Sequence, residues 1–276
     1  MQTAYQPKDI RIPKAKPLIK WPGGKRSLAP IILNFIPESY RTYYEPFLGG
    51  GAIFFALQPD KAVLSDINDE LINTYIQIRD EPESLTKILK SLKNNEHDYY
   101  KVRSSSPRSP IRKAARIIYL TRLAFNGIHR VNQNGQFNVP YGYKEHLATV
   151  DEELLTVTSE SLRHAKLQAG DFEITTRKAG KGDVVYFDPP YTVAHANNGF
   201  IKYNEKIFSW NDQERLAEHA RSLASKGCRV IVSNADHPSI HSLYKDFYCH
   251  TVERPSVIAA ASAYRRKITE CIFVLG

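Results

Sequence analysis

Short β-prone runs separated by helix-like segments constrain the fold of this chain more than any other feature. The runs are Thr42–Glu45, Ala62–Ser65, Asp183–Phe187, Arg229–Ser233 and Glu270–Leu275. Strands that alternate with helices along a chain are joined by crossover connections, and such connections produce a mainly parallel sheet. We therefore predict an α/β fold.

The clearest helical pattern follows the loop near residue 210. Asn211 is predicted to be the N-cap, because its side chain can accept from the amide three residues on, at Glu214. Leu216 and Leu223 follow at helical spacing, and Gly227 can end the helix in a left-handed conformation.

The middle of the chain, from about Asn68 to Leu162, contains no convincing buried strand. Pro82 can open one helix, and Arg112–Phe125 has the apolar spacing of another. Asn134-Gly135 lies between β-prone segments, which is a signal for a hairpin turn. We therefore expect a mostly helical insertion that carries one β-hairpin.

These patterns predict two domains. A chain of 276 residues with 42% hydrophobic residues can bury a core without disulfides or metals. We assign residues 1–67 and 166–276 to the sheet-containing catalytic domain, and residues 68–165 to the inserted domain.

Charge and composition limit the partners and the location of the protein. Lys and Arg number 38 against 29 Asp and Glu, for a net charge of +9. A charge of this sign favours a polyanionic partner, because binding phosphates releases counterions, although a general solubility charge is the alternative. Apolar runs such as Val257–Ala261 are far shorter than the ~20 residues that span a bilayer.

The first twenty residues and the cysteines indicate a cytoplasmic protein. The first twenty residues carry six charged side chains, so we expect no signal peptide. Cys228, Cys249 and Cys271 form an odd set without CxxC spacing, which favours thiols in a reducing cytosol. We also expect a monomer that does not bind membranes.

A glycine loop, Phe47-Leu48-Gly49-Gly50-Gly51, follows the first β-prone run. Ligands of open α/β sheets bind beyond the carboxyl ends of the strands, and glycine allows the backbone to approach them closely. The dinucleotide fingerprint fails at Phe54, and the P-loop fails because Arg26 follows Gly24-Lys25. The loop therefore favours a nucleoside-like ligand, with an ordinary strand-to-helix turn as the alternative.

Asp66 comes directly after the second run. A carboxylate in this position can accept hydrogen bonds from both hydroxyls of a ribose. It can equally cap the helix that follows Ile67, and the two roles are compatible.

Asp188-Pro189-Pro190-Tyr191 follows the apolar run that ends at Phe187. The two prolines remove two amide donors, so carboxylate and carbonyl acceptors predominate. Such a loop suits an exocyclic amine, which has two N–H donors, and the Tyr191 ring can stack on a base. A rigid turn after a buried strand is the alternative.

Together these motifs resemble the Dam-type DNA adenine N6-methyltransferases, the D12 class, which uses S-adenosylmethionine. Pro22 departs from the family, which usually has Ala there, and Tyr143 stands where some close relatives carry a basic residue. The resemblance spans nearly the whole chain through Lys20–Lys25, Phe47–Gly51, Asp66, Phe125–Arg130, Phe137–Gly142, Gly170–Phe172, Asp188–Tyr191 and Ser233-Asn234.

The resemblance implies a Rossmann-like methyltransferase sheet, and an inserted domain that recognises double-stranded DNA through the hairpin. It implies cofactor contacts from Trp21, Lys25, Phe47, Gly49, Gly51, Asp66, Asp171, Phe172 and Asp188. It implies a catalytic loop of Asp188, Pro189 and Tyr191, and DNA contacts from Lys25, Asn126, Arg130, Asn132 and Pro140.

The implied reaction is methylation of N6 of an adenine flipped out of the duplex, within GATC if Arg130 reads guanine. No metal is expected, because the chain has no HExxH, CxxC or clustered His. Another adenine site, an RNA acceptor and an inactive DNA-binding regulator are the alternatives. Related enzymes acting on cytosine N4 or glutamine usually have Ser or Asn in place of Asp188.

Overall fold

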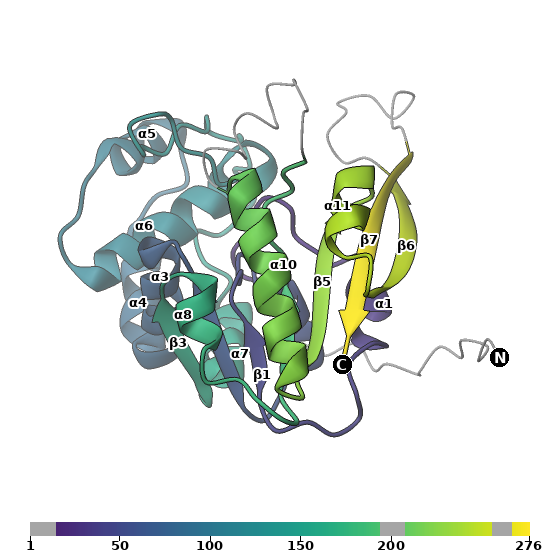
Figure 1. Cartoon of the computed structure of the whole chain (residues 1–276). Coiled ribbons are helices and arrows are strands. Elements are labelled where there is room, and N and C mark those ends of the chain that lie inside the picture. The colour runs from purple at the N-terminus through teal and green to yellow at the C-terminus, as the bar shows by residue number, and fades with distance from the viewer. Residues whose placement is uncertain (1–14, 194–207, 256–266) are drawn as a thin grey trace. The chain divides into compact units, whose positions relative to one another are not determined.

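The computed structural model describes residues 15–193, 208–255 and 267–276. Its strands form a seven-stranded sheet in the order β3-β2-β1-β4-β5-β7-β6 (Figure 1). The predicted α/β fold is confirmed, and each of the five predicted runs is a strand. The strands are β1 Tyr43–Glu45, β2 Ala62–Asp66, β3 Ala165–Ala169, β4 Val184–Phe187, β5 Arg229–Ala235, β6 Tyr248–Pro255 and β7 Lys267–Leu275.

The sheet is mainly parallel, as predicted. Strand β2 pairs in parallel with β3, and β4 pairs in parallel with both β1 and β5. Strand β7 runs antiparallel to β5 and β6. The sequence pattern did not reveal β3 and β6.

The helices of the described residues follow one another in chain order. Helix α4 opens at Pro82 as predicted, and α6 occupies most of the predicted Arg112–Phe125 helix. Their bounds are α1 Ala29–Leu33, α2 Ala52–Leu57, α3 Asp69–Asp80, α4 Pro82–Ser91, α5 Glu96–Ser104, α6 Pro110–Leu123, α7 Glu152–Leu162, α8 Phe172–Thr176, α10 Trp210–Ser225 and α11 Pro238–Leu243, with a 3-10 turn at Phe125–Gly127.

The chain divides into two compact units. The first comprises Met1–Leu33 and Leu48–Phe172, and the second comprises Asn34–Phe47 and Glu173–Gly276. This grouping shows which residues pack together, not which residues serve the cofactor or the DNA. The functional division into 1–67 with 166–276, and 68–165, therefore stays a prediction.

Helix α3 is the centre of the helical layer in the first unit. It packs against α4, α6 and α7 (Figure 1). Leu71, Tyr75 and Ile78 lie at helical spacing and are fully buried. Asn68 caps the helix by accepting from the Leu71 amide at 3.0 Å.

Helix α10 packs along β5 in the second unit (Figure 1). Its N-cap is Ser209, which forms a capping box with Asp212, so the predicted cap by Asn211 and Glu214 is wrong. Ser209 precedes the helix and its hydroxyl reaches the Asp212 amide at 3.2 Å, whereas Asn211 is already helical. Gly227 adopts a φ of 86°, which confirms the predicted left-handed end.

The predicted hairpin turn is present at Asn134-Gly135, where Gly135 has a φ of 74°. Isolated antiparallel bridges join Val131 to Phe137 and Ala124 to Tyr141. The segment therefore folds back on itself without forming two regular strands.

Among the described residues, no helix combines the length and the hydropathy that crossing a lipid bilayer requires.

Candidate active site

The glycine loop after β1 is tightly packed in the first unit. Gly49 and Gly51 have φ values of 48° and 70°, in the left-handed region that favours glycine. A Cβ atom on Gly49 would lie 3.0 Å from Trp21 Cδ1, and one on Gly50 would lie 3.0 Å from the Ile19 carbonyl. The loop therefore needs glycine both for its conformation and for the close approach of Trp21.

Asp66, at the carboxyl end of β2, holds this loop in place. Its Oδ2 accepts from the Gly49 amide and its Oδ1 accepts from the Asn68 amide, both at 3.0 Å. The Tyr75 hydroxyl donates to the Gly49 carbonyl at 2.9 Å. A carboxylate has about four acceptor positions, so Asp66 retains capacity for further donors.

The environment of Asp66 is unusual for a carboxyl group. Burial raises its pKa, and the backbone amides of Asn68 and Gly49 oppose this rise. The capping alternative is wrong for the described structure, because the N-cap of α3 is Asn68. Asp66 instead fixes the position of the glycine loop.

Asp171 and Phe172 follow the next strand in the first unit. Strands β2 and β3 are parallel, with Asp66 opposite Ala169, so Asp66 and Asp171 leave neighbouring strands at the same edge. The Gly170 amide donates to the Asp66 carbonyl at 3.0 Å. Phe172 is almost fully buried at the start of α8.

Trp21 connects the glycine loop to the hairpin segment. Its ring stacks on His129, with centroids 4.3 Å apart and planes 20° apart. Burial, with Arg116 nearby, lowers the pKa of His129 to about 4, so this imidazole is neutral near pH 7. Lys25 is also buried, and its Nζ donates to the Gly23 carbonyl at 2.9 Å.

The loop of Asp188 to Tyr191 belongs to the second unit and directly follows β4. The Tyr191 hydroxyl donates to Glu270 Oε2 on β7 at 2.9 Å. Burial, together with the charges of Asp188 and Glu270, raises the pKa of Tyr191 well above its usual value. Phe47 also belongs to this unit and contacts the rings of Phe187 and Phe208 edge-on.

A chain of hydrogen bonds that the sequence did not reveal supports this loop. Gln213 Nε2 on α10 donates to the Pro190 carbonyl at 3.1 Å. The Gln213 Oε1 atom accepts from Asn234 Nδ2 at 2.9 Å, and Asn234 Oδ1 accepts from the Ala235 amide at 2.9 Å. Gln213 and Asn234 are fully buried, so this chain fixes the Pro190 carbonyl against β5.

We predict that Gln213→Ala lowers the free energy of unfolding by about 2–4 kcal/mol, because two buried partners lose their hydrogen bonds. The rate of the predicted methyl transfer should fall as well, since the Pro190 carbonyl is no longer held. Urea unfolding and single-turnover kinetics measure the two effects. The matched control is Glu214→Ala, at an exposed position of the same helix. If Gln213→Ala and Glu214→Ala have the same stability and the same rate, Gln213 does not support the loop of Asp188 to Tyr191.

Four of the five predicted DNA-contacting residues lie on the surface of the first unit, whereas Lys25 is buried. Arg130 is exposed, and its Nε donates to Asn138 Oδ1 at 2.8 Å. Asn126 and Pro140 are also exposed, and Asn126 has a φ of 53°. Asn132 Oδ1 accepts from two amides of the hairpin turn, so this side chain also shapes the turn.

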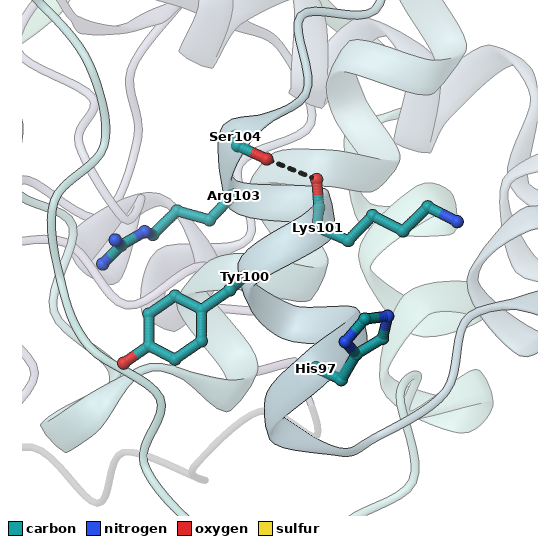
Figure 2. A pocket seen from close by; sticks show the side chains of 5 residues that line it. All are labelled: His97, Tyr100, Lys101, Arg103 and Ser104. Carbon is teal, nitrogen blue, oxygen red and sulfur yellow. Dashed lines mark hydrogen bonds between the residues drawn. The ribbon is translucent and has the colours of Figure 1, made fainter.

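A hollow of about 630 Å³ lies against α5 and is lined by His97, Tyr100, Lys101, Arg103 and Ser104 (Figure 2). Lys101 is exposed. Arg103 lies over the Tyr100 ring at 4.6 Å and donates to the Val139 carbonyl at 3.2 Å. The basic hollow is therefore joined directly to the hairpin segment that ends at Pro140.

The glycine loop and Asp66 lie beyond the carboxyl ends of parallel strands, where open α/β enzymes bind nucleotide-like ligands. Residues 21–258 match the family model of the D12 class N6 adenine-specific DNA methyltransferases. The chain belongs to this family, which confirms the resemblance and identifies an adenine-specific DNA methyltransferase.

Three curated relatives match this chain over most of their length. The chain is 45% identical over 267 residues to a type II methyltransferase of Lactococcus lactis subsp. cremoris, covering 93% of this chain and 94% of the relative. It is 33% identical to a type II methyltransferase of Methanocaldococcus jannaschii, covering 80% and 85%. It is 32% identical to the DNA adenine methylase of Vibrio cholerae, covering 94% and 95%.

Proposed function

We propose that this enzyme transfers a methyl group from S-adenosylmethionine to N6 of an adenine that is flipped out of double-stranded DNA, within the sequence GATC. The observation that carries the proposal is the loop of Asp188 to Tyr191. It directly follows β4, and its Pro190 carbonyl is fixed by Gln213.

The first unit fits the cofactor. The Gly49 to Gly51 backbone has no Cβ atoms, which would lie 3.0 Å from Trp21, 3.0 Å from the Ile19 carbonyl and 2.8 Å from Phe55 respectively. Asp66 has acceptor capacity for ribose hydroxyls, and Asp171 offers a carboxylate for an adenine amine. Trp21, Lys25 and Phe172 complete this set, and Phe47 and Asp188 are proposed as further cofactor contacts. When bound, S-adenosylmethionine supplies an electrophilic methyl group.

Asp188 and Pro189 then prepare the nucleophile. The lone pair of adenine N6 is delocalised into the ring, so the amine is a poor nucleophile while it is coplanar with the ring. Hydrogen bonds from N6 to the Asp188 carboxylate and the Pro189 carbonyl rotate the amine and localise the lone pair. Fixed acceptors of this kind act mainly through positioning and electrostatics.

Tyr191 provides a stacking face for the flipped adenine. Its hydroxyl is tied to Glu270, which fixes the plane of the ring. A fixed aromatic face stabilises a stacked base by ~1–3 kcal/mol. Flipping is required because N6 inside a duplex cannot reach a pocket at a strand end.

The basic hollow on α5 is suited to the DNA backbone. We predict that Lys101→Ala weakens binding equally for all DNA sequences and lowers the slope of log K against log salt by about one unit. The matched control is Lys87→Ala, at an exposed position on α4 outside the hollow. Fluorescence anisotropy at several salt concentrations measures the slope. Equal slopes for the parent, Lys101→Ala and Lys87→Ala would contradict a phosphate contact at Lys101.

Arg130 is the proposed reader of guanine. Its side chain is exposed on the hairpin segment and is oriented by Asn138. Arginine can donate two hydrogen bonds to guanine O6 and N7, the commonest specific contact in the major groove. Lys25 is proposed to contact another base pair from the cofactor side.

We predict that Arg130→Ala costs ~1–3 kcal/mol on GATC and relaxes selectivity at one position of the site. Methylation rates on GATC and on sites altered at one base, at fixed salt, measure this change. Lys101→Ala is the comparison, because a phosphate contact lowers all rates alike. A uniform loss for Arg130→Ala would contradict base reading, and a parent enzyme without preference for GATC would contradict the target assignment.

A further inference from the structure

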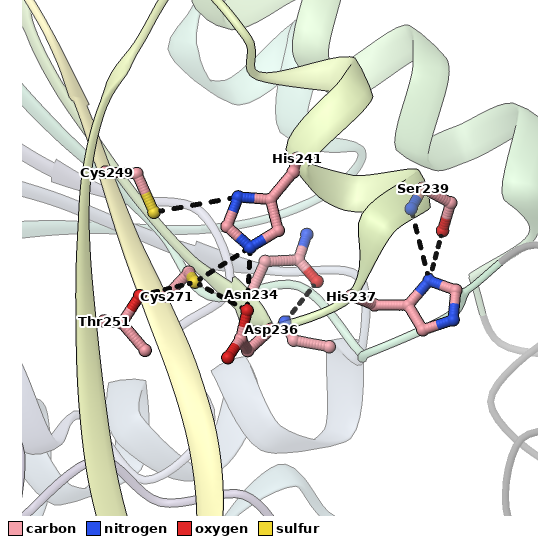
Figure 3. Close-up of polar contacts among 9 residues, drawn as sticks. Asn234, Asp236, His237, Ser239, His241, Cys249, Thr251 and Cys271 are labelled. Atoms are coloured by element: carbon pink, nitrogen blue, oxygen red, sulfur yellow. Dashed lines mark hydrogen bonds and ion pairs between the residues drawn. The ribbon is translucent and has the colours of Figure 1, made fainter.

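A cluster of possible metal ligands lies in the second unit, formed by three elements. His241 is on α11, Cys249 is on β6 and Cys271 is on β7 (Figure 3). One ligand atom from each residue lies within 4.8 Å of the others. Motif spacing could not reveal this cluster, because it depends on the folding of the last two strands against α11.

Strand register explains why the two sulfur atoms meet. Thr251 is opposite Cys271 and Cys249 is opposite Phe273 in the antiparallel pair of β6 and β7. Cys249 and Cys271 are therefore diagonal neighbours on one face of the sheet. His241 packs on the same face, with its ring 5.6 Å from that of Phe273.

The imidazole of His241 is oriented by a carboxylate. His241 Nε2 lies 2.7 Å from Asp236 Oδ1, which favours the tautomer with the proton on Nε2. The lone pair of Nδ1 is then available, and Nδ1 lies 4.0 Å from Cys249 Sγ. Metal-binding histidines usually have their second nitrogen held by a carboxylate or carbonyl in this way.

The three ligand atoms lie somewhat farther apart than those of an occupied tetrahedral site. Zinc binds sulfur at about 2.3 Å and imidazole nitrogen at about 2.0–2.1 Å, so its ligand atoms lie roughly 3.5–3.8 Å apart. Cys249 Sγ lies 4.0 Å from Nδ1, the proposed ligand nitrogen, whereas Cys271 Sγ lies 3.6 Å from the other ring nitrogen, Nε2; one ligand atom from each of the three residues lies within 4.8 Å of the others. Cation binding therefore requires the His241 ring and the two thiols to move closer together.

The burial of the cluster also suits a cation. Cys271 is fully buried, whereas the side chains of His241 and Asp236 are 40% and 28% exposed, which leaves a route for entry. A disulfide between Cys249 and Cys271 would use the sulfur atoms alone. The oriented imidazole beside them favours metal ligation over this alternative.

We propose that His241, Cys249 and Cys271 bind a soft divalent cation of the zinc type, with Asp236 positioning the imidazole. The ion ties α11 to β6 and β7, and it has a structural role. This site is separate from the proposed methyl-transfer site, and its test does not depend on activity.

The test uses the full chain without an affinity tag, purified without chelators and kept reduced. We expect about one equivalent of zinc per chain by elemental analysis. Added cobalt should give thiolate-to-cobalt charge-transfer absorption and the intense visible bands of tetrahedral coordination, and zinc should abolish both. Zinc should also raise the melting temperature of the metal-depleted protein.

Variants separate this site from adventitious binding. Cys249→Ser and His241→Asn should lose the charge-transfer band, and Asp236→Asn should weaken binding by about 10–100-fold. The matched control is Cys228→Ser, a buried free thiol that bonds to the Gly180 carbonyl and should leave the band unchanged. A band that survives in Cys249→Ser would overturn the proposal. So would a Cys249–Cys271 disulfide in a protein whose reduced form binds no cation.

Discussion

Asp188→Ala should lower the single-turnover rate of methyl transfer by about 100-fold or more, the scale for losing a group that stabilises the transition state. The carboxylate is proposed to accept a hydrogen bond from N6, so its loss leaves the lone pair delocalised. DNA affinity should change little, because phosphate contacts dominate it. Rapid-quench kinetics at saturating cofactor and DNA, with an anisotropy titration, measure both quantities.

The matched control for Asp188 is Asp171→Ala, a carboxylate that also follows a strand. The proposed role of Asp171 is to hold the adenine of the cofactor. The Asp171→Ala variant should therefore need more cofactor to reach saturation but should keep the parent rate at saturation. A melting curve confirms that both variants are folded. Near-normal single-turnover methylation by Asp188→Ala would eliminate the proposed activation of N6.

Asp66→Ala should weaken S-adenosylmethionine binding by about 1.5–3 kcal/mol, the range for hydrogen bonds to a charged group. This corresponds to roughly a 10- to 150-fold higher Kd. The carboxylate anchors the Gly49 amide, and its proposed second task is to offer acceptors to the ribose. Calorimetric titration measures the affinity, and thermal unfolding measures the stability.

Asn68→Ala is the matched control for Asp66. Asn68 is the N-cap of α3, and removing a cap costs about 1 kcal/mol of stability. This variant should be less stable but should bind the cofactor almost normally. If Asp66→Ala behaves in the same way, with reduced stability and unchanged affinity, Asp66 has no role at the ribose.

The sequence predicted the centre of the sheet better than its edges. The five predicted strands include β4 and β5, which contain short, continuous runs of buried residues. A continuous apolar run of this length is typical of a central strand rather than of an amphipathic helix. The two missed strands, β3 and β6, are the two edges of the sheet. In β3 the sequence AKLQA is mostly exposed or half-buried, so it carries little hydrophobic signal.

The sequence could indicate those parts of the candidate site whose residues are contiguous in the chain. The glycine loop, Asp66 and the loop at Asp188 each follow a strand directly, and that position can be read from the sequence. Gln213 and Glu270 could not be found, because each acts through a contact with a distant residue. In the sequence, nothing distinguishes Gln213 from the other polar residues of this amphipathic helix.

The same reasoning explains the cluster of His241, Cys249 and Cys271. Local spacing gave no metal motif, since each residue comes from a different element. The register of β6 and β7 brings the two thiols together, and β6 was one of the strands that the sequence did not reveal.

The most direct test of the central claim is a map of methylated adenines at single-base resolution. The enzyme is incubated with mixed-sequence double-stranded DNA, with and without S-adenosylmethionine, and Asp188→Ala is run in parallel. We predict N6-methyladenine within GATC, only when the cofactor is present, and almost none with the variant. Methylation without the cofactor, or at positions other than adenine N6, would contradict the account.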